Sequence, residues 1–252
     1  MRLLVLGGTT EASELARALA HDQRFRATLS LAGRTRHPAP QPLPCRIGGF
    51  GGVAGLGCYL KTNRVDALVD ATHPFAARMT RNAQTAAELT GTPLLVVQRP
   101  AWRKQSGDRW IDVPDMAAAA SALGPTPWRV LLTIGQKELA PFVAAPWHHY
   151  VLRSVDAPAP EHLPARAEVI AARGPFVEAA EHRLLLEKRI EVLVTKNSGG
   201  SATKAKLVAA RRLELPVVMV ARPPPPTAET VATVAEALAW LARHHAPCLR
   251  GV

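Results

Sequence analysis

The sequence predicts an α/β protein with two Rossmann-like parallel-sheet domains that face each other across a cleft. Short apolar segments alternate with segments of helical periodicity, an order typical of parallel strands joined by right-handed crossovers. The alternation restarts after residues 124–127 (Gly-Pro-Thr-Pro), which have the clearest linker composition. The length of 252 residues suits two modest domains, which we place at residues 1–126 and 127–252.

Four short apolar segments in the first half predict strands that are buried on both faces of a sheet. They span residues 2–6, 27–32, 67–70 and 93–97. Helices are predicted between them, at residues 11–20, 52–60 and 75–89. In the first of these helices, Leu15, Ala16 and Leu19 recur at helical spacing and form one apolar face.

The second half has the same alternation. It predicts strands at residues 129–134, 151–152, 168–171, 191–195 and 217–220. Helices are predicted at residues 177–188, 201–213 and 228–244. The four prolines of residues 223–226 predict a stiff connector into the final helix rather than a recognition ligand. We interpret His148 and His149 as the start of a strand and not as a metal site.

The chain is strongly basic, with 31 Lys+Arg against 20 Asp+Glu and a formal charge of +11. Apolar residues make up 48 %, which excludes a disordered or fibrous chain. The positive charge could be general surface composition, or it could serve nucleic acid or a small substrate with several carboxylates or phosphates. The cations form no Lys/Arg-rich runs, and many lie next to glycine-rich turns, which favours a small anionic ligand.

The sequence shows neither a signal-peptide core nor an apolar segment of membrane length. Apolar residues 3–6 end at Gly7, and no uninterrupted apolar run approaches the ~20 residues of a membrane span. The three cysteines, Cys45, Cys58 and Cys248, lack metal-ligand spacing and are interpreted as reduced thiols. We therefore expect a cytoplasmic protein with no metal site and no membrane partner.

The first glycine turn follows the first predicted strand and opens a helix, a place where backbone N–H groups and the helix dipole bind phosphate. It matches the dinucleotide pattern G-x-G-x-x-G only in part, because Thr9 and Ala12 occupy the second and third glycine positions. An ordinary tight turn is the alternative. The residues predicted to bind a cofactor here are Gly7, Gly8, Thr9, Thr10 and Glu11.

The end of the second predicted strand indicates which dinucleotide would bind. NAD sites carry an acidic residue roughly 20 residues beyond the glycine turn, to hold the ribose hydroxyls. This region contains no carboxylate and instead offers a cation with neighbouring hydroxyls, in the set Ser30, Gly33, Arg34 and Thr35. Arg34 would suit the 2′-phosphate of NADPH, although a single loop arginine can also be simply solvated.

Two further segments of the first half are candidates for ligand contact. Residues 48–52 are glycine-dense, which costs chain entropy and indicates close backbone approach, although an ordinary loop is the alternative. We assign Gly49, Phe50 and Gly51 to the cofactor. Thr72 and His73 follow the third predicted strand, where ligands bind in open α/β sheets. His73 could contact a ligand or supply a proton, or the pair could only cap the next helix.

The second half places cations and donors after several predicted strands, which indicates a polyanionic ligand. The densest segment is Thr195–Ser201, where hydroxyls, amides and a lysine precede a helix. It is not a Walker A loop, because its lysine precedes the glycines. The residues assigned to a substrate are Gly135, Gln136, Lys137, Arg153, Lys196, Asn197, Ser198, Gly199, Thr203 and Lys204.

Together these segments resemble the precorrin-6A reductase family of cobalamin biosynthesis. The resemblance rests on the two glycine turns of the first half, Gly33-Arg34-Thr35, Asp70–Ala76, Ile134-Gly135 and Thr195–Gly199. Each motif is weak alone, but they keep the family's order and span nearly the whole chain. Residues 36–44 and the C-terminal tail carry none of them.

The resemblance implies an NADPH-dependent oxidoreductase of tetrapyrrole biosynthesis. Its substrate would be precorrin-6A, a macrocycle with many acetate and propionate groups, and hydride transfer would yield precorrin-6B. Residues 1–126 would then bind NADPH and residues 127–252 the substrate. The resemblance leaves open a metal-free or a cobalt-bearing macrocycle, and it leaves the oligomeric state open, with a monomer compatible.

Reduction also needs a proton, and three side chains are candidates to deliver it or to orient the substrate: Lys196, His73 and Lys137. Solvent or substrate protons are the alternative. Two other functions stay open at this point, a different NADP-dependent reductase of a polycarboxylate and a basic nucleic-acid-binding α/β module. The second lacks a recognisable reading motif and interleaved aromatic residues, so we expect no nucleic-acid partner.

Overall fold

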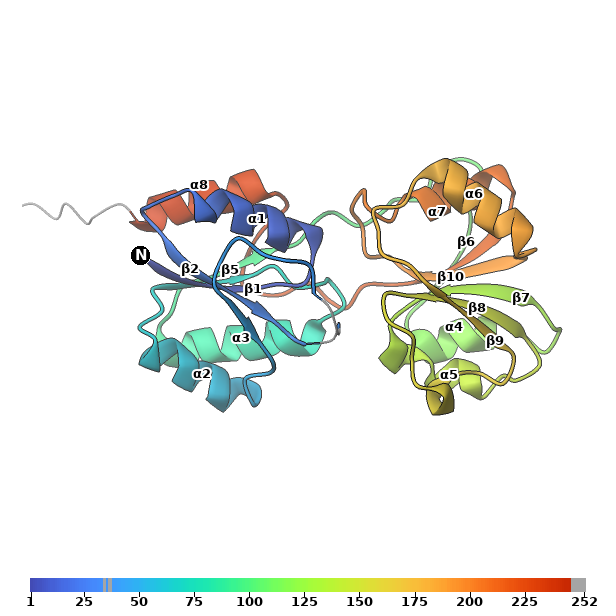
Figure 1. Ribbon diagram of the computed structural model, residues 1–252, viewed down its shortest axis with the longest axis horizontal. Helices are drawn as coiled ribbons and strands as arrows, with labels where there is room; N and C mark the ends of the chain where they lie inside the picture. Colours follow the sequence, from blue (N-terminus) through green and yellow to red (C-terminus); the bar gives the residue numbers. More distant parts are fainter. Residues whose placement is uncertain (34, 36–37, 246–252) are drawn as a thin grey trace, which may run out of the picture. The chain divides into compact units, whose positions relative to one another are not determined.

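The computed structural model describes residues 1–33, 35 and 38–245 and shows two α/β units, each built around a six-stranded sheet (Figure 1). The recorded strand pairings are parallel in both sheets. The predicted class of two Rossmann-like parallel-sheet domains is therefore confirmed. Among the described helices, none is both long and apolar enough to cross a membrane.

Unit 1 consists of Met1–Pro100 and the described part of the chain from Pro223 onward. Its strand order is β12-β5-β4-β1-β2-β3. The strands are β1 (Arg2–Leu6), β2 (Arg26–Leu31), β3 (Cys45–Ile47), β4 (Ala67–Asp70), β5 (Leu94–Val97) and β12 (Glu229–Val231). The helices are α1 (Thr10–Ala20), α2 (Gly52–Thr62), α3 (Ala77–Thr90) and α8 (Val234–His245).

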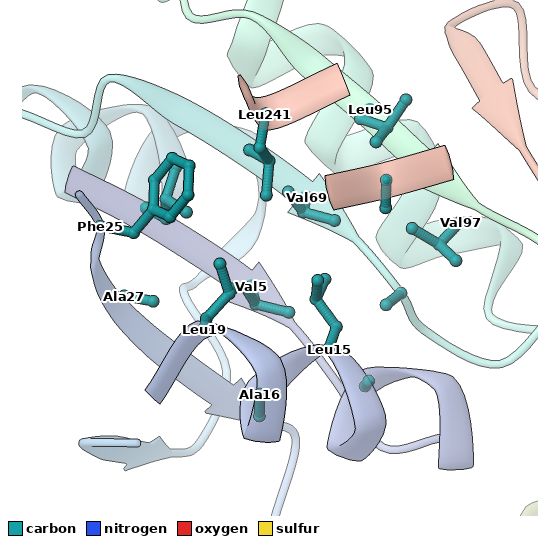
Figure 2. Packing of buried hydrophobic residues seen from close by; sticks show 14 of the residues in the cluster. Val5, Leu15, Ala16, Leu19, Phe25, Ala27, Val69, Leu95, Val97 and Leu241 are labelled. Atoms are coloured by element: carbon teal, nitrogen blue, oxygen red, sulfur yellow. The ribbon is translucent and has the colours of Figure 1, made fainter. Parts of the chain in front are cut away.

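Helices cover both faces of the unit 1 sheet, with α1 and α8 on one face and α2 and α3 on the other (Figure 1). Successive residues of β1 point to opposite faces: Leu3 and Val5 join the core under α1 and α8, whereas Leu4 and Leu6 pack under α2 and α3. Figure 2 shows the first of these cores, with Leu15 of α1 directed toward the strands. A strand buried on both faces needs apolar residues at successive positions, which explains the unbroken apolar segment.

Unit 2 is Ala101–Arg222, with strand order β6-β11-β10-β7-β8-β9. The strands are β6 (Arg109–Val113), β7 (Arg129–Thr133), β8 (His149–Ser154), β9 (Ala167–Ala171), β10 (Val192–Lys196) and β11 (Pro216–Val220). The helices are α4 (Met116–Ala122), α5 (Ala140–Val143), α6 (Glu178–Glu187) and α7 (Ala205–Arg212), with 3₁₀ turns η1 (Gln136–Glu138) and η2 (Pro160–His162). Helices α6 and α7 cover one face and α4 and α5 the other (Figure 1).

The chain passes from unit 1 to unit 2 and back, so the structure divides it twice rather than once after residue 126. Residues 101–126 belong to unit 2, because β6 pairs with β11 in its sheet. The chain returns at Pro223, and the proline-rich segment leads into β12, which pairs with β5. Trp240 and Leu241 of α8 then complete the unit 1 core. The linker composition at residues 124–127 instead marks the turn between α4 and β7.

The elements that the sequence prediction misses include the strands β3, β6 and β12 and the short helix α4. All three strands lie at sheet edges, where partial exposure removes the continuous apolar pattern of the central strands. β12 takes residues 229–231 from the predicted helix 228–244, so α8 begins only at Val234. The predicted strand start at His149 is confirmed.

The residue before β8, His148, is completely buried and carries a pH-dependent share of the stability of unit 2. Its Nδ1 accepts a hydrogen bond from the Trp128 backbone N–H at 3.2 Å, and its ring packs against Trp147 and Tyr150. Burial lowers the pKa of His148, and a backbone contact with Gly124 opposes this more weakly.

The lowered pKa predicts a loss of stability in mild acid. In the unfolded chain, His148 titrates near ~6.5 and so binds a proton at a higher pH than the folded chain does. Its stabilising contribution is complete above that value and is lost as the pH falls toward the lowered pKa. Between about pH 7.5 and 5.5 we expect a loss on the order of 1 kcal/mol in the free energy of urea unfolding. His148→Phe should reduce this dependence of the unfolding free energy on pH. The same change at exposed His149 is the control and should leave the dependence unaltered. An equal pH dependence in both variants would contradict the assignment to His148.

Candidate active site

The turn between β1 and α1 is shaped by its two glycines. The Gly7 N–H donates to the Ser30 carbonyl at 2.9 Å, which holds the turn against β2. A Cβ at Gly7 would lie 2.7 Å from Leu29 Cδ1, so any larger residue would require the Leu29 side chain to shift. Gly8 has φ +117°, a conformation that other residues rarely adopt. The glycines therefore serve the close packing of the turn, and a Cβ at Gly8 would meet nothing within 4 Å, which leaves its surface open.

Thr9 caps α1 and ties the turn to the end of β4. Its Oγ1 accepts from the Ala12 N–H at 3.1 Å and donates to the Ala71 carbonyl at 2.8 Å. The hydroxyl thus has a structural role, and Ala12 is buried at the third position of the pattern. The N–H groups of the first helical turn, which begins at Thr10, have no acceptor within the helix. This helix N-terminus can receive a phosphate.

Glu11 forms an ion pair with Arg99, which follows β5, with Oε2 and Nη1 2.6 Å apart. Both side chains are largely buried, with 20 % and 14 % of their surfaces exposed. The arginine offsets a carboxylate that would otherwise repel an anion at the helix N-terminus. The structure therefore gives Glu11 a role in orienting Arg99 at the same edge of the sheet.

The region after β2 differs from the sequence expectation in its details. Arg34 lies outside the described residues. Ser30 is buried, and its Oγ accepts from Nη1 of Arg46 at 2.9 Å. The Ser30 hydroxyl therefore supports a second arginine, which the sequence analysis misses because β3 is too short to be recognised. Gly33 and Thr35 follow β2 at the same edge.

The glycine segment after β3 presents an open backbone. Gly48, Gly51 and Gly52 have φ values of +122°, +81° and +86°, which explains why these three are glycine. Gly49 has no such requirement, and a Cβ there would meet nothing within 4 Å. Because the fold does not explain Gly49, close approach of a ligand is a sufficient reason for it. The Phe50 ring packs edge-on against Tyr59 of α2.

The residues after β4 form a hydrogen-bonded turn around buried Asp70. Its Oδ1 accepts from the Thr72 N–H at 3.0 Å, and Oδ2 has no hydrogen-bond partner among the described residues. His73 Nδ1 accepts from the Phe75 N–H at 3.2 Å, so Nε2 carries the proton of the neutral ring. This turn fixes the orientation of His73. Neither Thr72 nor His73 caps α3, because the N-cap residue of that helix is Ala76, which has no side-chain capping bond.

In unit 2, Glu138 contacts two of the segments predicted to bind the substrate, the turn after β7 and the end of β10. Its Oε2 accepts from the Gly135 N–H and from Lys196 Nζ, both at 2.8 Å. Lys196 is the last residue of β10, and 15 % of its side-chain surface is exposed. Its ammonium is therefore held at a defined position beside the β7 turn. Sequence reasoning misses Glu138, because no spacing rule links a carboxylate to a lysine 58 positions away.

Three of the residues predicted to bind the substrate instead contact protein groups: Asn197, Gln136 and Arg153. Asn197 accepts from the Trp102 N–H at 2.8 Å and donates to its carbonyl at 3.0 Å. Gln136 donates to the Asp156 carbonyl. Arg153 is buried, forms an ion pair with Glu181 and stacks its guanidinium 3.9 Å from the ring centroid of Phe176. These contacts leave the three side chains little capacity for a substrate.

The remaining predicted residues lie on two neighbouring stretches of unit 2. Lys137 is exposed in η1, beside Gly135. Ser198 and Gly199 are buried directly after β10, and Thr203 and Lys204 precede α7, with Lys204 exposed. β7 and β10 are adjacent in the sheet, so these cations belong to one edge. No group of three or more His, Cys, Asp or Glu in the described chain could hold a metal ion.

Comparison with known proteins assigns the chain to a family. The family model described as precorrin-6x reductase CbiJ/CobK matches residues 2–242. The chain is 53 % identical over 246 residues to the precorrin-6A reductase of Rhodobacter capsulatus, covering 97 % of each. It is 30 % identical over 240 residues to the cobalt-precorrin-6A reductase of Salmonella typhimurium, covering 88 % of each.

The solved structures give the same result. A structure of CobK precorrin-6A reductase matches with a TM-score of 0.92 and 52 % identity, covering 100 % of this chain and 99 % of the other. The family model and these relatives each match most of the chain, including both units. The chain therefore belongs to the precorrin-6x reductase family and is an oxidoreductase.

Proposed function

We propose that the protein reduces precorrin-6A to precorrin-6B with NADPH, as a step of cobalamin biosynthesis. Membership of the precorrin-6x reductase family supports both the reduction and the identity of precorrin-6A as the substrate. The observation that best supports the nucleotide is the carboxyl edge of the unit 1 sheet, where the α1 N-terminus follows β1 and the open glycine segment follows β3, two strands away. When bound, NADPH supplies the hydride, and the protein contributes binding, orientation and electrostatics.

In unit 1, different residues bind different parts of NADPH. The N–H groups of the α1 N-terminus, from Gly8 to Glu11, hold the pyrophosphate. The backbone at Gly49–Gly51 admits close contact. Arg34 and Thr35 receive the 2′-phosphate, as the sequence indicates. The turn at Thr72-His73 lies beyond β4, where it contacts the nucleotide.

In unit 2, cations bind the carboxylates of the macrocycle. Lys196, Lys137 and Lys204 provide the charge, and Ser198, Gly199 and Thr203 provide donors beside them. Lys196 is the best placed of the three lysines, because Glu138 holds its ammonium before a substrate arrives. Such preorganisation lowers the entropic cost of orienting the substrate. We exclude Arg153 from this set, since Glu181 and Phe176 occupy it.

Reduction of a conjugated double bond requires a proton as well as a hydride. We assign the proton to Lys196, whose ammonium can donate and then recover a proton from solvent, because 15 % of the side-chain surface is exposed. We further propose a metal-free macrocycle. The relatives named precorrin-6A reductase are 44–53 % identical to this chain, whereas those named cobalt-precorrin-6A reductase are 28–31 % identical.

Cofactor preference tests the nucleotide assignment. We expect the protein to bind NADPH more tightly than NADH, measured by the change in nicotinamide fluorescence on titration. Arg34→Ala should weaken NADPH about tenfold to a hundredfold, the range for a lost charge-assisted contact, and should leave NADH nearly unchanged. Arg17→Ala, an exposed position late in α1, is the matched control and should change neither affinity.

Two results would contradict this assignment. If the unmodified protein binds NADPH and NADH equally, it does not recognise the 2′-phosphate. If Arg34→Ala weakens both cofactors to the same extent, Arg34 acts on the fold of the turn or on a group that the two cofactors share.

A further inference from the structure

Arg46 is a half-buried cation held entirely by neutral groups. It lies in β3, opposite Ser30 in the register of β2. Its Nη1 donates to Ser30 Oγ and to the Gly48 carbonyl, both at 2.9 Å, and its Nη2 donates to the Gly49 carbonyl at 3.0 Å. The guanidinium stacks 3.8 Å from the ring centroid of Phe50. These contacts position the guanidinium and the glycine segment as one rigid group.

The charge of Arg46 is uncompensated within the described part of the chain, because no carboxylate there pairs with it. Removing a cation from water without a counter-ion is unfavourable, so the site attracts an anion. Arginine has five N–H donors, and the three bonds above leave the Nε–H and one Nη2–H without a protein acceptor. Nε and Nη2 share one edge of the planar group, which suits two parallel bonds to a phosphate.

The surroundings indicate which anion binds. β3, which carries Arg46, ends at the same carboxyl edge of the sheet as β1, and the two strands are separated by β2. The adjoining Gly48, Gly49 and Gly51 have open space where side chains would be, so a ligand can closely approach the segment whose carbonyls hold the guanidinium. In open α/β sheets this edge, beyond the second strand, receives the adenosine ribose of a dinucleotide. The ribose carries a phosphate in NADPH and a hydroxyl in NADH.

We infer that Arg46 is a specificity-determining residue that binds the 2′-phosphate of NADPH. This inference rests on the proposed NADPH dependence and adds a second cation to the one that the sequence indicates at Arg34. Arg46 has two effects: its Nη1 and Nη2 order the glycine segment, and its remaining donors discriminate the phosphorylated ribose. An arginine that only ordered the segment would affect both nicotinamide cofactors equally.

Calorimetric titration with two fragments separates these effects: adenosine 2′,5′-bisphosphate, which carries the 2′-phosphate, and adenosine 5′-monophosphate (AMP), which differs from it only in lacking that group. The unmodified protein should bind the bisphosphate at least about tenfold more tightly than AMP, since a charge-assisted contact contributes at least one factor of ten. Arg46→Gln should reduce this ratio about tenfold, and Arg46→Lys should restore part of it, because lysine keeps the charge but not the planar fork. Arg17→Gln, with the same change in charge, should leave the ratio unchanged.

The outcomes distinguish the two levels of the proposal. If the unmodified protein prefers the bisphosphate and Arg46→Gln weakens both fragments equally, Arg46 only orders the glycine segment and the inference is overturned. If the unmodified protein shows no preference, the NADPH assignment fails as well, and the inference fails with it. Thermal unfolding of each variant shows whether it is folded; should Arg46→Gln not fold, the ratio measured for Arg46→Lys decides, and an unchanged ratio there counts against the inference.

Discussion

Lys196→Ala is expected to lower kcat/KM for macrocycle reduction by about three orders of magnitude. Loss of a charge-assisted contact to a substrate carboxylate should raise KM about tenfold to a hundredfold. Loss of the proton donor should lower kcat by about a hundredfold or more. NADPH affinity should stay unchanged, since Lys196 belongs to unit 2 and the nucleotide residues belong to unit 1. Steady-state kinetics with precorrin-6A, together with NADPH titration, measure these three quantities.

Lys196→Arg separates the two roles of the lysine. Arginine keeps the positive charge and should restore most of the KM, but it does not release its proton near neutral pH, so kcat should stay low. Lys188→Ala is the control, because Lys188 pairs with Glu168 at an exposed position outside the proposed site. Unchanged kinetics in Lys196→Ala would remove this residue from the site, and full recovery of kcat in Lys196→Arg would rule out its role as the proton donor.

Breaking the buried pair of Arg153 and Glu181 should cost about 3–5 kcal/mol in the free energy of unfolding of unit 2. Only 5 % and 3 % of their side-chain surfaces are exposed, so Glu181→Ala leaves a guanidinium in the interior with no opposite charge. Replacing both residues, as Arg153→Met with Glu181→Leu, should recover most of this loss, because it removes both charges. Urea unfolding of the variants provides the comparison.

The same double variant tests the position of Arg153. We expect the KM of the double variant for precorrin-6A to be nearly unchanged, because the pair is internal. A large rise in KM would show that Arg153 contacts the substrate. The exposed pair of Arg109 and Glu214 is the control for stability. Glu214→Ala should cost no more than about 1 kcal/mol, as surface ion pairs usually do.

The central strands and the strand-end turns could be predicted from the sequence, because each has a local cause. Residues 3–6 of β1 and 67–69 of β4 are buried on both faces and therefore continuously apolar. The turn at Gly7 and Gly8 is recognisable because Gly8 has a positive φ and a side chain at Gly7 would displace Leu29. The shared order of strand, turn and helix then places the turns of each sheet on one edge, which is why the candidate residues could be grouped.

What the sequence did not predict depends on contacts between distant residues. The exchange of β6 and β12 between the two halves is decided by strand pairing across more than a hundred residues, which no local pattern records. Arg46 and Glu138 acquire their roles only when the fold brings them to Ser30 and Lys196. Conversely, Arg153 ends a strand as predicted, and its partner on α6 removes it from solvent.

The most direct test of the proposed reaction is isotope tracing in precorrin-6A reduction, read by mass spectrometry. With NADPH deuterated at both C4 positions, in ordinary water, the product should gain two hydrogens, one of them deuterium. With unlabelled NADPH in heavy water, and exchangeable positions washed back, the product should again retain one deuterium, now from the proton donor. An unreduced macrocycle, or a product with no label from NADPH, would contradict hydride transfer from this cofactor.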